Sequence, residues 1–389
     1  MAQSTIEYSM FLIFSGAAVL ATLALFARQA MIVAYIVLGI ILGPWGLGLV
    51  TDPILIKDFS NIGIIFLLYL LGMDLFPQQL WSMLGKALST TLISSLVFWL
   101  LGFGVGCLFG YQVRESLLLG ATLMFSSTII GVKLLPTTIL HHKHTGQLII
   151  SVLLLQDLMA IIILLLLQGF GKGGNLLFDI FFQVISLPVL VMIAWILERF
   201  ILVKLISKFD QIHEYIFLLA IAWCLGISEL ADVMGLSHEI GAFIAGVTLA
   251  SSPIAFFITE KLKPLRDFFL VIFFFTLGAT FNMDMIGVLI FPALLIALIV
   301  ILIKPVIFKY LFSWTGENPD ISLEVGFRLG QISEFSMLIA VLAVASGFIG
   351  IKTSYLIQLS TLLTFIISSY IIVLRYPTPI AISDSLRRD

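Results

Sequence analysis

Charged residues are scarce in this 389-residue chain, at 11%, and neither sign dominates because the net charge is −2. A chain so poor in charge cannot cover a water-facing surface, which excludes an ordinary soluble domain. The slight acidic balance leaves no basic face for nucleic acid. Two cysteines, Cys107 and Cys224, are too few for a disulfide framework, and we interpret both as small buried apolar residues.

What the chain has instead is apolar sequence, at 61% of all residues and a mean hydropathy of +1.18. Apolar runs of about 20 residues recur, and each is long enough to cross roughly 30 Å of hydrocarbon as a helix. The pattern predicts an all-α polytopic membrane protein and excludes a barrel of alternating strands. Charged and Gly/Pro-rich breaks predict about thirteen transmembrane helices, near 9–27, 31–50, 60–76, 87–110, 115–138, 147–168, 178–206, 213–231, 236–252, 267–282, 285–311, 321–347 and 353–376.

The basic residues indicate the orientation of these spans, because cytoplasmic loops collect Lys and Arg. If the N-terminus is outside, most of the 20 Lys and Arg residues lie in inner loops. An odd number of spans then places the C-terminus in the cytoplasm.

A faint internal repeat supports the same count. Residues 69–72 in the third predicted span resemble residues 275–278 in the tenth, and the same offset carries Ser127 to Ser333. Each span thus corresponds to the span seven places later. Because seven is odd, the sequence predicts two six-helix units with inverted topology and a seventh helix as connector.

Polar residues interrupt the fifth and twelfth predicted spans at mid-membrane, where every polar group must be satisfied within the protein. They are Ser126, Ser127 and Thr128 in the fifth span and residues 330–334 in the twelfth. One interpretation is two continuous helices that pack closely through small side chains. The other is two discontinuous helices that cross, so that backbone groups at their half-helix ends line an ion site.

Asp157 lies deep in the sixth predicted span, beside Gln156. A carboxylate at a helix centre costs about 2.5–3.5 kcal/mol on insertion scales, so it indicates a function, although a buried acid tied to a neighbouring helix is the alternative. Burial favours the protonated acid and a nearby cation favours the ionised one, so the two ligands compete. Gln156 either supplies a carbonyl oxygen or braces the site. Ser126, Ser127 and Thr128 add oxygen ligands that suit alkali ions.

Lys304, Arg328 and Glu334 are further charged residues inside predicted spans. Lys304 either snorkels to the cytoplasmic end of its span, or it neutralises negative half-helix ends or pairs with the buried aspartate. We expect Arg328 and Glu334 to compensate charge as ion pairs, each with a partner on another helix. His238 and Glu239 begin the ninth span, as a gate or as an acid that complements the helix dipole.

Together these motifs resemble the membrane domain of Kef-type members of the monovalent cation/proton antiporter family, over about Phe11 to Tyr376. The resemblance implies an NhaA-like fold of thirteen helices, a homodimer, and an elevator-like movement of an ion-binding core against a dimerisation domain. The motifs are Gly-Pro-Trp-Gly at 43–46, Phe-Ser-Ser-Thr at 125–128, Gln-Asp at 156–157, His-Glu-Ile-Gly-Ala-Phe at 238–243 and Gly-Gln-Ile-Ser-Glu-Phe at 330–335. The implied dimerisation domain comprises 1–86 and 209–283, the core 87–172 and 284–378, the linker helix 173–208 and the short cytoplasmic tail 379–389.

The same resemblance implies that Asp157 carries the cation or the proton. Gln156 stands where relatives have Asn or Asp, a variant that looks potassium-preferring and electroneutral. Kef-type proteins commonly continue into a nucleotide-binding regulatory domain, which we expect to be separate or missing because the chain ends soon after Tyr376. Many members have Gly-Gly-Glu-Phe where residues 332–335 stand here, so the geometry of that break is open.

We therefore predict a secondary active transporter, not an enzyme, that exchanges K⁺, or Na⁺ in second place, for H⁺ by alternating access. It needs no cofactor, and we expect it in a bacterial-type inner membrane. Two alternatives are a sodium-coupled symporter of an organic anion on the same fold and a gated cation channel. An intramembrane aspartyl protease is disfavoured, because the sequence has no second Asp at the depth of Asp157.

Overall fold

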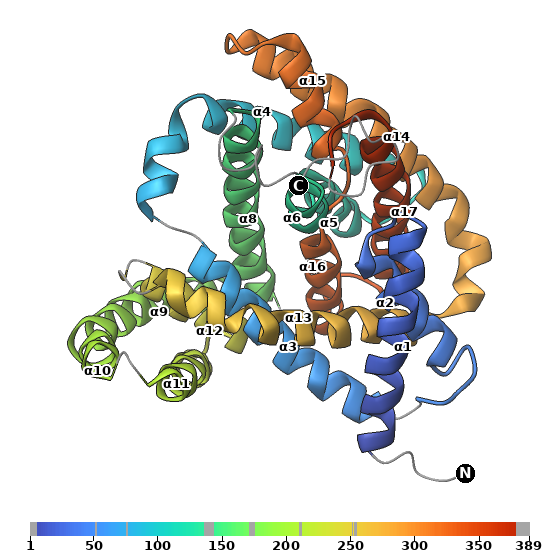
Figure 1. The fold of residues 1–389 in the computed structure, drawn as a ribbon. Helices are drawn as coiled ribbons and strands as arrows, with labels where there is room; N and C mark the ends of the chain where they lie inside the picture. Colours follow the sequence, from blue (N-terminus) through green and yellow to red (C-terminus); the bar gives the residue numbers. More distant parts are fainter. Residues whose placement is uncertain are drawn as a thin grey trace. The chain divides into compact units, whose positions relative to one another are not determined.

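The elements that the structure describes are helices (Figure 1). A computed structural model describes residues 6–50, 53–74, 77–135, 144–170, 176–209, 212–250, 252 and 255–378. The helices are α1 (Ile6–Phe26), α2 (Met31–Leu42), α3 (Pro53–Asp74), α4 (Pro77–Leu108), α5 (Val113–Met124), α6 (Thr128–Lys133), α8 (His144–Phe170), α9 (Leu176–Leu197), α10 (Val203–Lys208), α11 (His213–Val233), α12 (His238–Ala250), α13 (Ala255–Thr280), α14 (Ile286–Trp314), α15 (Pro319–Arg328), α16 (Glu334–Ala345) and α17 (Ile351–Arg375). A π-helical turn, Glu198–Leu202, joins α9 to α10, and a 3-10 turn, Met283–Met285, precedes α14.

Within those ranges, seven helices are long and apolar enough to cross a membrane, as expected of an integral membrane protein. Four shorter apolar helices accompany them, and each predicted span overlaps one helix or consecutive helices. The count of thirteen transmembrane helices stays a prediction. The seven long ones are Ile6–Phe26, Ala87–Leu108, Val113–Gly131, His144–Leu164, Glu214–Val233, Met283–Trp314 and Ile351–Arg375.

The chain divides into two compact units, each assembled from separate stretches of sequence. The predicted linker helix falls in the first unit, and the predicted tail 379–389 lies outside the described residues. The roles of dimerisation domain and ion-binding core stay predictions. Residues 1–18, 35–81 and 172–280 form the first unit, and residues 19–34, 82–171 and 281–389 form the second.

Glycines allow two pairs of helices in the first unit to touch backbone to backbone. A Cβ atom added to Gly72 of α3 would lie 3.1 Å from the Cα of Gly246 in α12, and one added to Gly246 would overlap the carbonyl oxygen of Tyr69. Gly39 of α2 and Gly278 of α13 make an equivalent crossing, with 3.1 Å between a Cβ on Gly278 and the Cα of Gly39. Only glycine fits such close approaches between helices.

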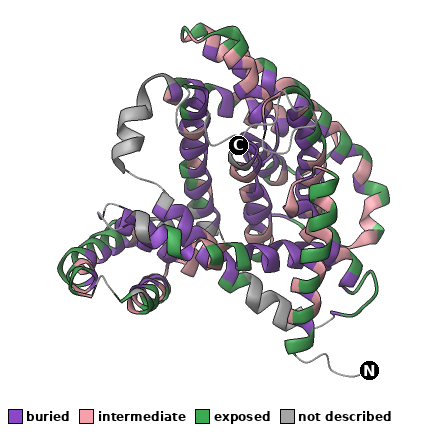
Figure 2. Ribbon diagram, in the orientation of Figure 1, coloured by how far each residue is buried: buried purple, intermediate pink, exposed green. Residues whose placement is uncertain are grey.

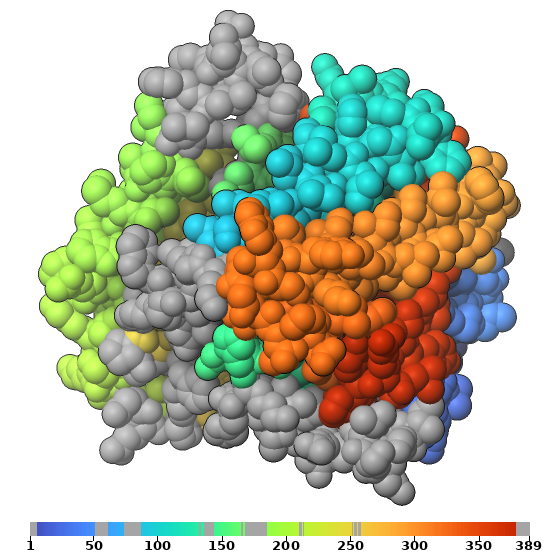
Figure 3. All heavy atoms as spheres, turned by 90° about the horizontal axis from the view of Figure 1, so that it is seen from above, coloured from blue at the N-terminus to red at the C-terminus, as the bar shows by residue number. Residues whose placement is uncertain are grey.

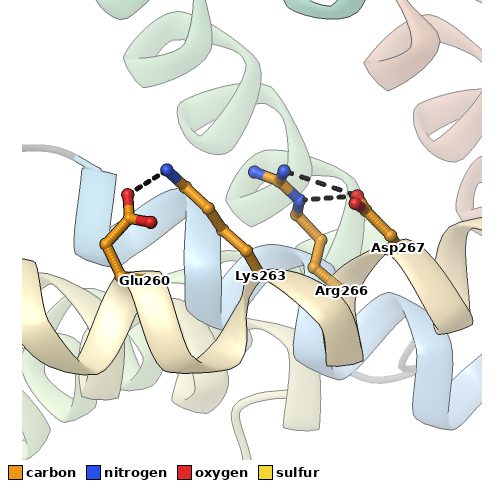
Figure 4. Close-up of polar contacts among 4 residues, drawn as sticks. All are labelled: Glu260, Lys263, Arg266 and Asp267. Carbon is orange, nitrogen blue, oxygen red and sulfur yellow. Dashed lines mark hydrogen bonds and ion pairs between the residues drawn. The ribbon is translucent and has the colours of Figure 1, made fainter.

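The helix α13 begins twelve residues earlier than the span predicted at 267–282. Its first half carries charges that pair along one helix: Lys263 contacts Glu260, and Arg266 lies 3.4 Å from Asp267 (Figure 4). Pairs spaced three residues apart support a helix by a few tenths of a kcal/mol, although exposed pairs add little to overall stability. The segment between the predicted spans 236–252 and 267–282 is therefore helical from Ala255 onwards.

In the second unit, α16 packs against α5, α8 and α17, and most of its residues are buried (Figure 2). An apolar cluster in the same unit joins α4, α8, α14 and α15, and it packs the segments that carry the polar residues described next. Its buried members are Phe98, Leu135, Leu148, Ile149, Val152, Leu153, Phe308, Phe312, Val325 and Leu329.

Candidate ion-binding site

Two helices of the second unit are interrupted inside the protein. α5 ends at Met124 and α6 begins at Thr128, while α15 ends at Arg328 and α16 begins at Glu334. The connecting backbone is extended, with φ −86° and ψ 145° at Phe125. Serine favours such breaks because its hydroxyl bonds to nearby backbone groups in place of the helix ladder. The interpretation as two continuous helices is therefore wrong.

Equivalent serines start both second half-helices. The Ser127 Oγ accepts a hydrogen bond from Ile130 N at 3.1 Å, and the Ser333 Oγ accepts one from Phe335 N at 3.1 Å. Each hydroxyl satisfies an N–H group that has no partner within its own helix. Ser127 and Ser333, which correspond to each other in the sequence repeat, therefore have the same structural role.

The two breaks lie against each other. The Ser126 hydroxyl, fully buried, donates to the carbonyl oxygen of Leu329 at 2.8 Å. One break therefore supplies the partner for a backbone group of the other.

The ammonium group of Lys304 lies among the carbonyl groups of both breaks. It donates to Phe125 O at 2.8 Å and to Gln331 O at 3.0 Å, and it lies 3.4 Å from Ser126 Oγ and 5.2 Å from the ring centre of Phe98. The side chain is 1% exposed, so it does not snorkel to an interface. Its positive charge meets oxygen atoms that carry partial negative charge at the ends of half-helices.

The carboxylate of Glu334 lies at the opposite kind of helix end. Its Oε1 accepts from the Thr128 hydroxyl at 2.6 Å and from Ile129 N at 3.2 Å, and Glu334 is itself the first residue of α16. These partners are a hydroxyl and an amide, so the expectation of an ion pair on another helix is wrong for this oxygen. A negative charge is favourable where N–H groups point outwards at helix starts.

Gln156 and Asp157 lie on α8 and are 0% and 2% exposed. The Oε1 of Gln156 accepts from Ser126 N at 2.8 Å, so its carbonyl oxygen braces the α5–α6 break. Among the described residues, its Nε2 and the Oε2 of Glu334 have no hydrogen-bond partner. The structure thus places Asp157 next to a residue that is bonded directly to the break.

Arg328, fully buried, binds three partners. Its Nε donates to Glu324 Oε1 at 2.9 Å, its Nη1 to Leu134 O at 3.1 Å and its Nη2 to Pro377 O at 2.9 Å. We expected an ion pair with another helix, but the acid partner, Glu324, lies one turn earlier on α15 itself. The remaining donors reach carbonyl groups outside α15.

The other two candidate residues belong to the first unit. His238 begins α12, with Nδ1 4.0 Å from a Glu229 carboxylate oxygen and Nε2 3.9 Å from Asp232, and Glu239 lies in the first turn of the same helix. The structure thus groups Gln156, Asp157, Ser126, Ser127, Thr128, Lys304, Glu334 and Arg328 in one unit, and His238 and Glu239 in the other.

Sequence reasoning missed the contribution of α17 to the second break. Gln331 Oε1 accepts from Ser368 Oγ at 3.1 Å, and Ile332 N donates to Thr364 Oγ1 at 3.1 Å. Thr364 and Ser368 are buried and four residues apart, so they share one helix face. The spacing of four residues between Thr364 and Ser368 could have indicated, from sequence alone, a polar face of this helix that points into the protein.

Comparison with known proteins supplies the family. The sequence pattern described as "Sodium/hydrogen exchanger, transmembrane" matches residues 12–374. K(+) efflux antiporter 4 of Arabidopsis thaliana is 30% identical over 322 residues, which are 80% of this chain and 54% of that protein. The Iron transporter MagA of Paramagnetospirillum magneticum is 26% identical over 348 residues, 88% of this chain and 79% of that protein.

A solved structure shares the fold. The sodium proton antiporter MjNhaP1 from Methanocaldococcus jannaschii matches with a TM-score of 0.70 at 19% identity, over 94% of this chain and 95% of that one. The chain spans about half the length of the plant K(+) efflux antiporters it matches. Since the family pattern covers nearly all of it, the chain belongs to the transmembrane sodium/hydrogen exchanger family of cation/proton antiporters, whose members are transporters.

Proposed function

We propose that the protein exchanges a monovalent cation for H⁺ by alternating access, and that Asp157 binds the two ions in turn. The observation that carries this proposal is the burial of Asp157, at 2% exposure, beside Gln156, which holds the interrupted helix α5–α6 through Ser126 N. A buried carboxylate accepts either a proton or a cation to stay neutral, and that is the minimum chemistry for exchange.

The charges around the breaks support this assignment. Lys304 meets carbonyl oxygens of both breaks, while Glu334, the first residue of α16, meets an N–H and a hydroxyl group at the start of α6. The partial charges at the half-helix ends are therefore compensated by fixed side chains. Asp157 is the acid that we assign to the transported ion, with Ser126, Ser127 and Thr128 on the neighbouring break as a source of oxygen ligands.

We favour K⁺ as the cation because two relatives at about 30% identity are named K(+) efflux antiporters, and Na⁺ is second because MjNhaP1 is named a sodium proton antiporter. Exchange is electroneutral if Asp157 carries either one cation or one proton. We place the N-terminus outside and the C-terminus in the cytoplasm of a bacterial-type inner membrane.

We further infer that the protein is a homodimer of NhaA-like inverted repeats, in which 87–172 and 284–378 form the moving core and 1–86 and 209–283 the dimerisation domain. The two glycine crossings, Gly39 with Gly278 and Gly72 with Gly246, support the repeat, since each joins one helix from either half. The paired serine caps Ser127 and Ser333 support it independently.

Purified protein in liposomes that contain a pH-sensitive dye tests the proposal. Addition of K⁺, Na⁺ or Li⁺ in turn should move protons with wild-type protein, and Asp157→Asn should abolish this movement while the protein remains folded. Asp157→Asn exchange at the wild-type rate would show that the assigned carrier is wrong. Na⁺ uptake that depends on an organic anion, without proton movement, would favour the symporter, and flux insensitive to an opposing proton gradient would favour the channel.

A further inference from the structure

Arg328 joins the end of α17 to the second helix break. We propose that it is a positioning residue, which couples residues 376–378, the segment that follows α17, to the carbonyl groups of the α15–α16 break. This inference rests on the proposed function, because the property that it controls is the affinity of the site for the transported cation.

The contacts on one side of Arg328 fasten the end of α17 to the last turn of α15. Its Nη2 donates to Pro377 O at 2.9 Å, and its guanidinium carbon lies 5.6 Å from the ring centre of Tyr376. The rings of Phe327 and Tyr376 are 6.0 Å apart, and the guanidinium of Arg375 lies 4.9 Å from the Phe327 ring. Figure 3 shows α15 in orange beside the end of α17 in red.

The contacts on the other side reach the candidate site within one residue. The Arg328 carbonyl oxygen accepts from Gln331 Nε2 at 2.9 Å, and the next carbonyl, that of Leu329, accepts from Ser126 Oγ at 2.8 Å. Gly326, three residues before Leu329, lies directly against the backbone of Pro305, the neighbour of Lys304. A Cβ atom added to Gly326 would lie 2.7 Å from Pro305 Cα. A shift of this turn therefore moves the groups that Lys304 and Ser126 bind.

The chemistry of the side chain suits a coupling role. A guanidinium is a planar fork that binds several acceptors in fixed directions, and here it also reaches Leu134 O, just beyond α6, at 3.1 Å. An ammonium is a compact charge on a flexible stem and cannot hold the same acceptors in one geometry. Coupling between two sites is reciprocal, so ion binding at the break must also change the segment at 376–378.

Hydrogen–deuterium exchange on the full chain in lipid nanodiscs, with K⁺ against choline, measures this reciprocity. We expect K⁺ to change the exchange rate of the peptide that covers residues 371–378 in the wild type. Arg328→Lys should abolish that change and raise the K⁺ concentration for half-maximal proton movement about tenfold, because an ammonium cannot keep the bonds to both Leu134 O and Pro377 O.

Lys352→Gln serves as a matched control, because it removes a positive charge near the start of the same helix α17 and should retain the response. A response in Arg328→Lys equal to the wild type, or its loss in Lys352→Gln, would overturn the coupling.

If Arg328→Lys does not fold, measurements on the wild type alone still test the coupling. Active K⁺-dependent proton movement with no K⁺ response at 371–378 refutes the coupling and leaves the proposed function standing. Wild-type liposomes without any cation-dependent proton movement refute the proposed function, and the coupling with it.

Discussion

Replacement of Lys304 by Gln should weaken folding more than transport. The ammonium donates two short bonds, to Phe125 O and Gln331 O, and both acceptor residues are buried at 1% and 0% exposure. A hydrogen bond to a charged group contributes about 1.5–3 kcal/mol, and a buried carbonyl left without a donor costs about 1–3 kcal/mol. The amide of Gln is shorter and neutral, and it can replace only part of these hydrogen bonds. We therefore expect Lys304→Gln to lower the free energy of unfolding by about 2–4 kcal/mol.

The assay compares melting temperature with transport on the same preparation. Intrinsic fluorescence follows unfolding in detergent, and cation-dependent proton movement in liposomes is normalised to folded protein. Lys309→Gln removes a charge from the same helix, α14, at a partly exposed position, and it should melt like the wild type. A normal melting temperature for Lys304→Gln together with lost exchange would refute the reasoning, since Lys304 would then act in transport and not in support of the breaks.

Three further changes test the breaks and the glycine crossings. Ser127→Ala and Ser333→Ala should each lower stability by about 1 kcal/mol, because each removes a helix cap; an effect in only one of them, measured by thermal unfolding, would contradict their equivalence. Gly246→Ala should lower the melting temperature strongly, because the new Cβ overlaps Tyr69 O. Gly287→Ala is its control, since no atom of the described residues lies within 4 Å of a Cβ there, and it should melt at the wild-type temperature; equal melting of the two variants would rule out the close crossing.

Much of the second unit was predictable because composition at mid-membrane is restrictive. Polar residues at 126–128 and 330–334 within apolar runs indicated either two interruptions or two closely packed continuous helices, and the structure has interruptions at 125–127 and 329–333. Lys304 was assigned to half-helix ends as one of several options, and only its contacts select that option. A charge inside hydrocarbon has few tolerable partners, which is why its role could be narrowed from sequence.

The partners of Arg328, Glu334 and α17 could not be predicted in the same way. A helical hydroxyl bonds equally well to its own backbone or to a neighbouring helix, and the rotation of each helix decides between them. Thr364 does both, since it accepts from Ile332 N and donates to Thr361 O. The length of α13 was underestimated for a related reason, because charged residues end an apolar run without ending a helix.

The backbone crossings of the first unit bear on how that unit responds to force. Where side chains separate two helices, rotamer changes allow them to slide by small steps. Gly72 and Gly246, like Gly39 and Gly278, offer no rotamers at the crossing point. Sliding of the helices at these points requires whole peptide groups to pass each other. We therefore expect each helix pair either to remain in contact, as a rigid unit, or to separate completely.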